Sequence, residues 1–389
     1  MAPGDSRQLR DLAAAVRDEA TLHPSADGEE YDDALPQTWG GPRAPRWYAA
    51  ALEVFASDHS ANRGRRALVT GGGSGIGFYV AKLLAAVGMA VILPCRPALE
   101  HEAYGAAEAI RKAVPGAAVE VPPLPLDLAS FASVNAFAAH MRANGSAIDV
   151  LGLNAGRGGS DADPIVRTAD AQEITMQVNY LSHALLVHEL LPVLRKSSHV
   201  RIVAHTSSAR NNARPSDFDD LAGRRWGATP WHLYSTSKAA LCMLAKALNP
   251  RLAQAGVRGV ALVADPGLAA TGVNVQHDLA RVLGLHRRGI KDTKAFHDAA
   301  AVHAADAALP MALAALEGHA DALYVGDGPS ATSLEAAAHR AGHLLWQDVR
   351  RGDPMLWSEA EAERLWTQTW KILDPFKSDF SWESSKDEL

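Results

Sequence analysis

A glycine-rich turn between a strand and a helix constrains this chain more than any other feature. The turn covers 70–77 (TGGGSGIG), follows the apolar run 67–69, and precedes apolar residues at helical spacing over 80–87. Glycines let a backbone turn tightly and approach a ligand, and N–H groups at a helix start suit a pyrophosphate. With a second strand expected over 89–93, the pattern favours a dinucleotide-binding turn over a merely structural one. The expected cofactor contacts from this turn are Gly71, Ser74, Gly75, Ile76 and Gly77.

Composition narrows the classes of protein that the chain can belong to. It has 389 residues, 48% of them hydrophobic and 21% charged, which is typical of a soluble globular protein. A net charge of -6 gives no reason to expect nucleic acid as a partner. The two cysteines, Cys95 and Cys242, do not make a disulfide framework. Without a run of about 18 apolar residues or a metal-binding His-Glu-x-x-His motif, we expect no transmembrane segment and no metal.

The two ends of the chain point to different compartments. Residues 1–30 contain no apolar core of a signal peptide, whereas 386–389 (KDEL) has the form of a retention signal of the endoplasmic reticulum. We expect a cytoplasmic protein, with the lumen of the endoplasmic reticulum as the alternative if the N-terminus is incomplete.

Strand-like and helix-like segments alternate over most of the chain. Strands are expected near 67–70, 89–93, 118–121, 148–152, 200–205, 258–263 and 322–325, and helices near 75–87, 98–113, 130–143, 170–195 and 233–255. This alternation predicts an α/β fold with a doubly wound parallel sheet of about seven strands, whose carboxyl ends gather the ligands. We assign 63–330 to this domain, 1–62 to a partly disordered N-terminal extension, and 331–389 to a helical C-terminal extension and tail. A short helix over 47–55 is expected to dock on the domain.

Three strand ends carry residues suited to an NADP molecule. Arg96 lies about 20 residues beyond the glycines, where an acidic residue would bind the ribose hydroxyls of NAD and an arginine suits the extra phosphate of NADP. Asp127, with Leu128, follows the third strand and could accept from the adenine, or else lie near a helix N-cap. The fourth strand closes on Asn154, Ala155 and Gly156, which are small enough for the cofactor to pass close beside them.

Tyr234 and Lys238 form the pair on which the chemistry depends. Their i, i+4 spacing places both side chains on one helix face. A free phenol has a pKa near 10, and a neighbouring ammonium favours its phenolate. The tyrosine would then act as acid in ketone reduction and as base in alcohol oxidation. A chance pair on an amphipathic helix is the alternative.

Together these motifs resemble the short-chain dehydrogenase/reductase family. The resemblance covers about 65–330 and implies a Rossmann fold with a seven-stranded sheet. It implies that Tyr234 is the proton donor and acceptor, that Lys238 lowers its pKa and holds the nicotinamide ribose, and that Asn179 anchors a proton-relay water. It also implies that Ser208 binds the substrate oxygen, with Ser207 as the competitor. Further cofactor contacts are implied for Pro266, Gly267, Leu268 and Thr271.

Within the family, the chain is most similar to retinol-dehydrogenase-like and protochlorophyllide-reductase-like members. The similarity lies in the arginine at 96, the 179–186 helix and the long separation between Ser208 and Tyr234. A substrate lid is implied over 272–310, and Trp226 and Trp231 either line an apolar pocket or simply pack. The chain departs from the family pattern at three positions, Leu153, Arg157 and Ser182. Arg157 puts a charge beside the cofactor turn.

These observations predict an NADP-dependent oxidoreductase that passes a hydride between the nicotinamide of NADPH and a bulky, apolar carbonyl or alcohol. Two alternatives stay open: a non-enzymatic NADP-binding sensor or scaffold, and a reductase of a tetrapyrrole double bond. The sequence identifies neither the substrate nor the oligomeric state.

Overall fold

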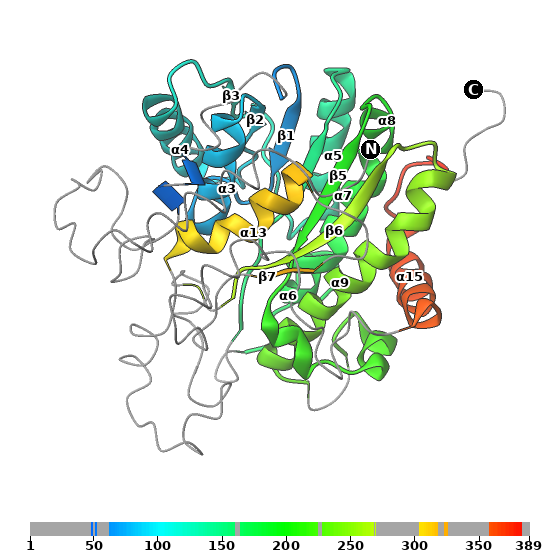
Figure 1. The fold of residues 1–389 in the computed structure, drawn as a ribbon. Helices are drawn as coiled ribbons and strands as arrows, with labels where there is room; N and C mark the ends of the chain where they lie inside the picture. Colours follow the sequence, from blue (N-terminus) through cyan, green and yellow to red (C-terminus); the bar gives the residue numbers. More distant parts are fainter. Residues whose placement is uncertain are drawn as a thin grey trace, which may run out of the picture.

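One parallel sheet forms the centre of the molecule (Figure 1). The computed structural model describes residues 48–49, 51–52, 62–159, 164–224, 228–267, 269, 303–317, 323–325 and 358–382. The strands are β1 (Arg66–Val69), β2 (Ala90–Ile92), β3 (Val119–Glu120), β4 (Val150–Leu153), β5 (Val200–His205), β6 (Gly259–Asp265) and β7 (Leu323–Val325). They pair in parallel in the order β3-β2-β1-β4-β5-β6-β7. This confirms the predicted doubly wound sheet, and its order reverses between β1 and β4, where a ligand crevice is expected.

Helices cover both faces of the sheet (Figure 1). One face carries α3 (Gly75–Ala86), α4 (Glu100–Ala113) and α13 (Ala304–Glu317). The other carries α5 (Phe131–Ala143), α7 (Ser182–Glu189), α8 (Leu191–Leu194), α9 (Pro230–Gln254) and α15 (Glu359–Leu373). Short turns complete the second layer: α6 (Ile174–Met176), the π-helical η2 (Gln177–Leu181), and the 3-10 turns η3 (Ser208–Asn212) and η4 (Pro215–Asp220). The single helix expected over 170–195 is therefore broken into four pieces, α6, η2, α7 and α8.

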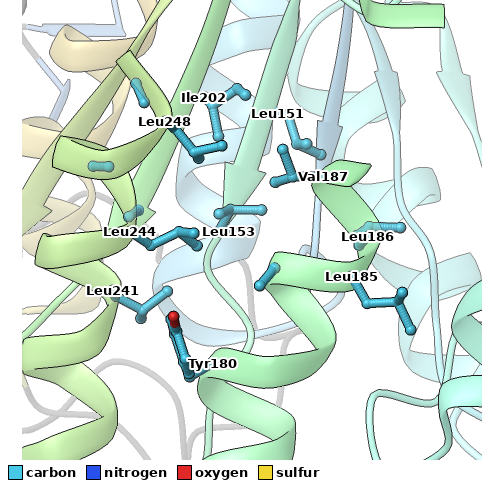
Figure 2. Packing of buried hydrophobic residues seen from close by; sticks show 14 of the residues in the cluster. Leu151, Leu153, Tyr180, Leu185, Leu186, Val187, Ile202, Leu241, Leu244 and Leu248 are labelled. Carbon is cyan, nitrogen blue, oxygen red and sulfur yellow. The ribbon is translucent and has the colours of Figure 1, made fainter. Parts of the chain in front are cut away.

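Apolar side chains from strands and helices interdigitate between the layers. Figure 2 shows Leu153 of β4 and Ile202 of β5 facing α7 and α9, where Val187 and Leu244 meet them. These side chains are at most 2% exposed. Because strands of a parallel sheet are buried on both faces, their sequences are nearly continuous apolar runs. The positions of the strands could therefore be predicted well from the sequence.

The C-terminal helix α15 closes the second layer by packing on α9. Its Thr369 hydroxyl lies 2.6 Å from the Tyr180 hydroxyl of η2, and both residues are buried. Trp366 and Trp370 pack against the same apolar cluster. The helix expected from 361 to 370 is thus present, and its two tryptophans make the core contacts expected of them.

Helix α13 corrects the expected extent of the substrate lid. The lid was expected to run from 272 to 310, but Ala304 to Pro310 are buried in α13, which packs against α3. Alanine and leucine on every side of this helix suit a fully buried position. His303 is buried as well, and the remainder of the expected lid, 272–302, lies outside the described residues.

A short piece of the N-terminal extension docks on the same layer. Tyr48 is buried; its hydroxyl donates to the Tyr79 carbonyl at 3.0 Å, and its backbone N–H donates to Asp306 of α13 at 3.0 Å. Docking of the segment around Tyr48 is therefore confirmed. Among the helices of the described ranges, none has both the length and the apolarity needed to cross a membrane.

Candidate active site

A cavity of about 780 Å³ lies at the carboxyl ends of the strands. Most residues expected from the sequence line it: Gly71, Ser74, Gly75, Ile76, Gly77, Arg96, Asp127, Leu128, Asn154, Ala155, Gly156, Tyr234, Lys238, Pro266 and Gly267. Leu268, Thr271 and Trp226 lie outside the described residues. Two predicted catalytic residues, Asn179 and Ser208, are not part of its lining. Its volume falls within the range of about 300–1,000 Å³ that small-molecule sites occupy.

The glycine turn forms a cradle for a phosphate group. Gly71 and Gly75 adopt positive φ angles of 66° and 53°. A Cβ at Gly77 would lie 2.3 Å from the Gly71 carbonyl oxygen, so no larger residue fits without displacing the turn. Ser74 precedes α3 without capping it through its side chain, and the first turn holds no acidic residue. The N–H groups of this helix start are therefore available to an anion, and the residues fit a dinucleotide.

A buried hydrogen-bond network holds the fourth strand against this turn. The Thr70 hydroxyl accepts the N–H groups of Asn154 at 2.9 Å and Ala155 at 3.0 Å. His183 lies 3.0 Å from the same hydroxyl through Nε2 and 2.8 Å from the Asn179 carbonyl through Nδ1. Burial lowers the pKa of His183 to about 4, so the ring is neutral near pH 7. Nδ1 must then be the donor to the carbonyl, and Nε2 is an acceptor.

Asn179 positions its neighbours instead of facing the cavity. Its Nδ2 donates to the Arg157 carbonyl and to the Ser237 hydroxyl, each at 2.9 Å, and its Oδ1 accepts the Arg157 N–H at 2.8 Å. This side chain therefore ties the loop after β4 to helix α9, which carries Tyr234 and Lys238. The π-helical turn η2 places Asn179 for these contacts, a distortion typical of functional sites.

Tyr234 and Lys238 lie together, buried at the cavity wall. The Lys238 Nζ is 5.9 Å from the centre of the Tyr234 ring and donates to the His205 carbonyl at 2.9 Å. Burial lowers the pKa of Lys238 to about 8, against the opposing effect of nearby Asp265. Burial also raises the pKa of Tyr234 to about 12, against a hydrogen bond from Ser207 that lowers it.

The pKa of Tyr234 therefore shifts in the direction opposite to the one expected from the sequence. Lys238 was expected to lower the pKa of Tyr234, but the pKa is raised, mainly by loss of solvation on burial and further by the charge of Asp265. The protonated phenol is the form that carbonyl reduction requires, because the tyrosine must then act as an acid.

The structure favours Ser207 over Ser208 as the serine of the site. Ser207 lines the cavity and hydrogen-bonds to the Tyr234 hydroxyl. Ser208 is exposed and begins the 3-10 turn η3. The expectation for Ser208 is therefore corrected: the turn starts directly after β5 and carries the second serine away from the phenol. Motif spacing alone does not separate adjacent serines.

Sequence reasoning missed three further residues at the site, His205, Asp265 and Arg210. His205 is buried and its Nδ1 lies 2.8 Å from Asn154 Oδ1, which joins the ends of β5 and β4. Burial, with the charge of Lys238, lowers the pKa of His205 to about 3, so the ring is neutral. Asp265 forms a buried ion pair with Arg210 and accepts the Gly267 N–H at 3.0 Å. Their position in the sequence could have pointed to two of them, because His205 and Asp265 are the last residues of β5 and β6.

Among the residues that the structure describes, no three His, Cys, Asp or Glu side chains converge as metal ligands would. Cys242 is buried, with its Sγ 3.2 Å from the Thr206 hydroxyl, and packs within the core as expected.

The ring of Trp231 lies beside the ring of Tyr234, with 5.5 Å between the ring centres and a tilt of 39° between the planes.

Comparison with known proteins agrees with this fold. The family model for short chain dehydrogenases matches residues 65–280, and the chain belongs to this family of oxidoreductases, whose members bind nicotinamide cofactors. Mouse polyprenol dehydrogenase is 36% identical over 212 residues, which are 54% of this chain and 61% of that protein. Human retinol dehydrogenase 13 is 36% identical over 223 residues, 57% of this chain and 62% of that protein. The resemblance to retinol-dehydrogenase-like members is confirmed.

The matches with the two curated relatives cover only part of each protein. The chain spans less than two thirds of the length of these two curated relatives. A crystal structure of an uncharacterised protein from Mycobacterium paratuberculosis is 26% identical with a TM-score of 0.58. It covers 84% of this chain and 98% of that one, so it supports the fold over most of the sequence.

Proposed function

We propose that this protein is an NADP-dependent reductase of carbonyl compounds that can also oxidise the corresponding alcohols. The observation that carries the proposal is the placement of the Tyr234 phenol, which lies with Ser207 and Lys238 in a cavity that also contains the glycine turn suited to a phosphate. When bound, the nicotinamide supplies or accepts the hydride. Tyr234 donates the proton to the carbonyl oxygen, Ser207 orients that oxygen, and Lys238 supplies a nearby positive charge.

Arg96 supports the choice of NADP. It is exposed at the end of β2 and lines the cavity together with the glycine turn. A guanidinium there suits a phosphate dianion, and no carboxylate between 89 and 99 competes for ribose hydroxyls.

Replacing Arg96 should change the cofactor preference. Arg96→Asp removes the phosphate partner and adds repulsion, so the ratio of kcat/KM for NADPH over NADH should fall by about 10-fold or more. Arg96→Lys, which keeps the charge, should retain most of the preference. A wild-type protein that already prefers NADH would contradict the NADP assignment.

The substrate side of the cavity has an apolar wall. Val166, Ile174 and Val178 line it, and Val166 is 43% exposed. This wall supports a bulky, apolar substrate. The test is a panel of retinoid, steroid, quinone and aliphatic carbonyls with NADPH, followed by loss of its absorbance. Tight NADPH binding without turnover of any of them would favour a non-enzymatic binding protein instead.

The two adjacent serines give a matched pair of variants. Ser207→Ala should lower kcat by about 10²-fold, because it removes the hydroxyl that contacts the phenol. Ser208→Ala should keep kcat within about 2-fold, since surface substitutions are usually close to neutral. The reverse order of the two effects would restore Ser208 as the catalytic serine.

A further inference from the structure

Arg157 brings a positive charge to the catalytic end of the cavity. It follows Gly156 beyond β4 and lines the cavity together with Tyr234 and Lys238. Two hydrogen bonds with the Asn179 side chain fix the backbone of Arg157. The Arg157 N–H donates to Asn179 Oδ1 at 2.8 Å, and the Arg157 carbonyl accepts from Asn179 Nδ2 at 2.9 Å. The main chain therefore holds Arg157 in place, and its side chain needs no structural contact to do so.

Among the described residues, the guanidinium of Arg157 has no acidic partner. Over the described ranges, no hydrogen bond or ion pair joins this side chain to another residue. Two other arginines differ in this respect, since Arg142 pairs with Glu189 at 2.9 Å and Arg210 pairs with Asp265. A guanidinium at a cavity wall that is paired with none of the described carboxylates is suited to an anion that arrives with a ligand.

The surroundings of Arg157 separate it from the two phosphate-binding parts of the cavity. The glycine turn and Arg96 follow β1 and β2, whereas Arg157 follows β4. The acidic residues of the cavity wall, Glu102 and Asp127, also come from the part of the chain around β2 and β3. The same cavity also has the apolar wall formed by Val166, Ile174 and Val178. Arg157 and the nearby Lys238 therefore bring positive charge to a cavity that also has an apolar wall, which matches a molecule with an apolar body and one acidic group.

We infer that Arg157 binds a carboxylate of the substrate, so that the site selects apolar carbonyl compounds that also carry an acid group. The bond would be a bidentate, charge-assisted pair between guanidinium and carboxylate. The inference rests on the proposed function for the reaction, but the binding of the carboxylate can be measured without any turnover.

The test is binding of two isosteric ligands to the NADPH-loaded protein. 4-tert-Butylbenzoate and 4-tert-butylbenzamide share an apolar body and differ in charge, and isothermal calorimetry gives a Kd for each. The wild-type protein should bind the acid about 10-fold or more tightly than the amide, the effect expected of one charge-assisted pair. Arg157→Gln should abolish this preference, and Arg157→Lys should keep part of it.

A remote arginine provides the matched control. Arg258 is exposed just before β6, at the opposite end of the strands from the cavity, so Arg258→Gln should keep the preference for the acid. Equal binding of the two ligands, no detectable binding of the acid, or a preference that survives in Arg157→Gln would overturn the inference. Failure of carbonyl reduction would instead appear in the substrate panel, because the titration requires no reaction.

Discussion

Tyr234→Phe should reduce turnover by about 10²–10⁴-fold, the range that a positioned general acid contributes. The phenylalanine keeps the aromatic ring that packs beside Trp231, at 5.5 Å between ring centres. It removes only the hydroxyl, which hydrogen-bonds with Ser207 and which, in the proposed reaction, carries the transferred proton. The measurement is kcat with NADPH and the best carbonyl of the substrate panel, together with the Kd of NADPH from its fluorescence, which should change little.

Tyr104→Phe is the matched control for this variant. Tyr104 is 57% exposed on α4 and does not line the cavity, so the loss of its hydroxyl should leave kcat unchanged. Undiminished turnover of Tyr234→Phe would exclude this phenol as the proton donor. A large increase in the Kd of NADPH would show instead that the hydroxyl acts through cofactor binding.

The fold was predictable because its signals are local. The glycine turn needs a strand before it and a helix after it, and the apolar strands of a parallel sheet stand out in the sequence. Helix α13 was missed because its alanines and leucines show no polar face, so the segment gives no amphipathic period. The break in the 170–195 helix was missed for a different reason: at the π-helical turn Gln177–Leu181, the Asn179 side chain bonds to the Arg157 backbone and to the Ser237 hydroxyl, and these partners are distant in the sequence.

The chemistry of the site was predictable only in part. Residue types at strand ends predicted the cofactor-binding part of the cavity, because topology brings the carboxyl ends of parallel strands together. The i, i+4 spacing predicted that Tyr234 and Lys238 share one face of a helix, and both lie in α9. The choice between Ser207 and Ser208 depends on where β5 ends and η3 begins, which spacing does not fix. The protonation state of Tyr234 depends on how deeply the ring is buried, and burial of a single side chain is a tertiary property.

The buried ion pair of Asp265 and Arg210 should be the most sensitive structural contact of the site. The two side chains are 2% and 5% exposed, and the pair joins the end of β6 to the turn η3 that follows Ser207. Asp265 also accepts the Gly267 N–H at 3.0 Å, which holds the cofactor-binding turn after β6. Removing one charge from a buried pair leaves the other in a poorly solvated place.

Asp265→Asn should therefore lower the free energy of unfolding by about 3–5 kcal/mol, measured by urea denaturation. Asp219→Asn is the matched control, because Asp219 pairs with Arg364 at the surface, where both side chains are at least 33% exposed. Its loss should be at most about 1 kcal/mol. Replacing both buried partners by apolar residues, as in Asp265→Leu with Arg210→Met, should recover much of the stability, since no charge then remains buried. Similar small losses in Asp265→Asn and Asp219→Asn would show that water reaches the Arg210 guanidinium and that the pair does not hold the two strand ends together.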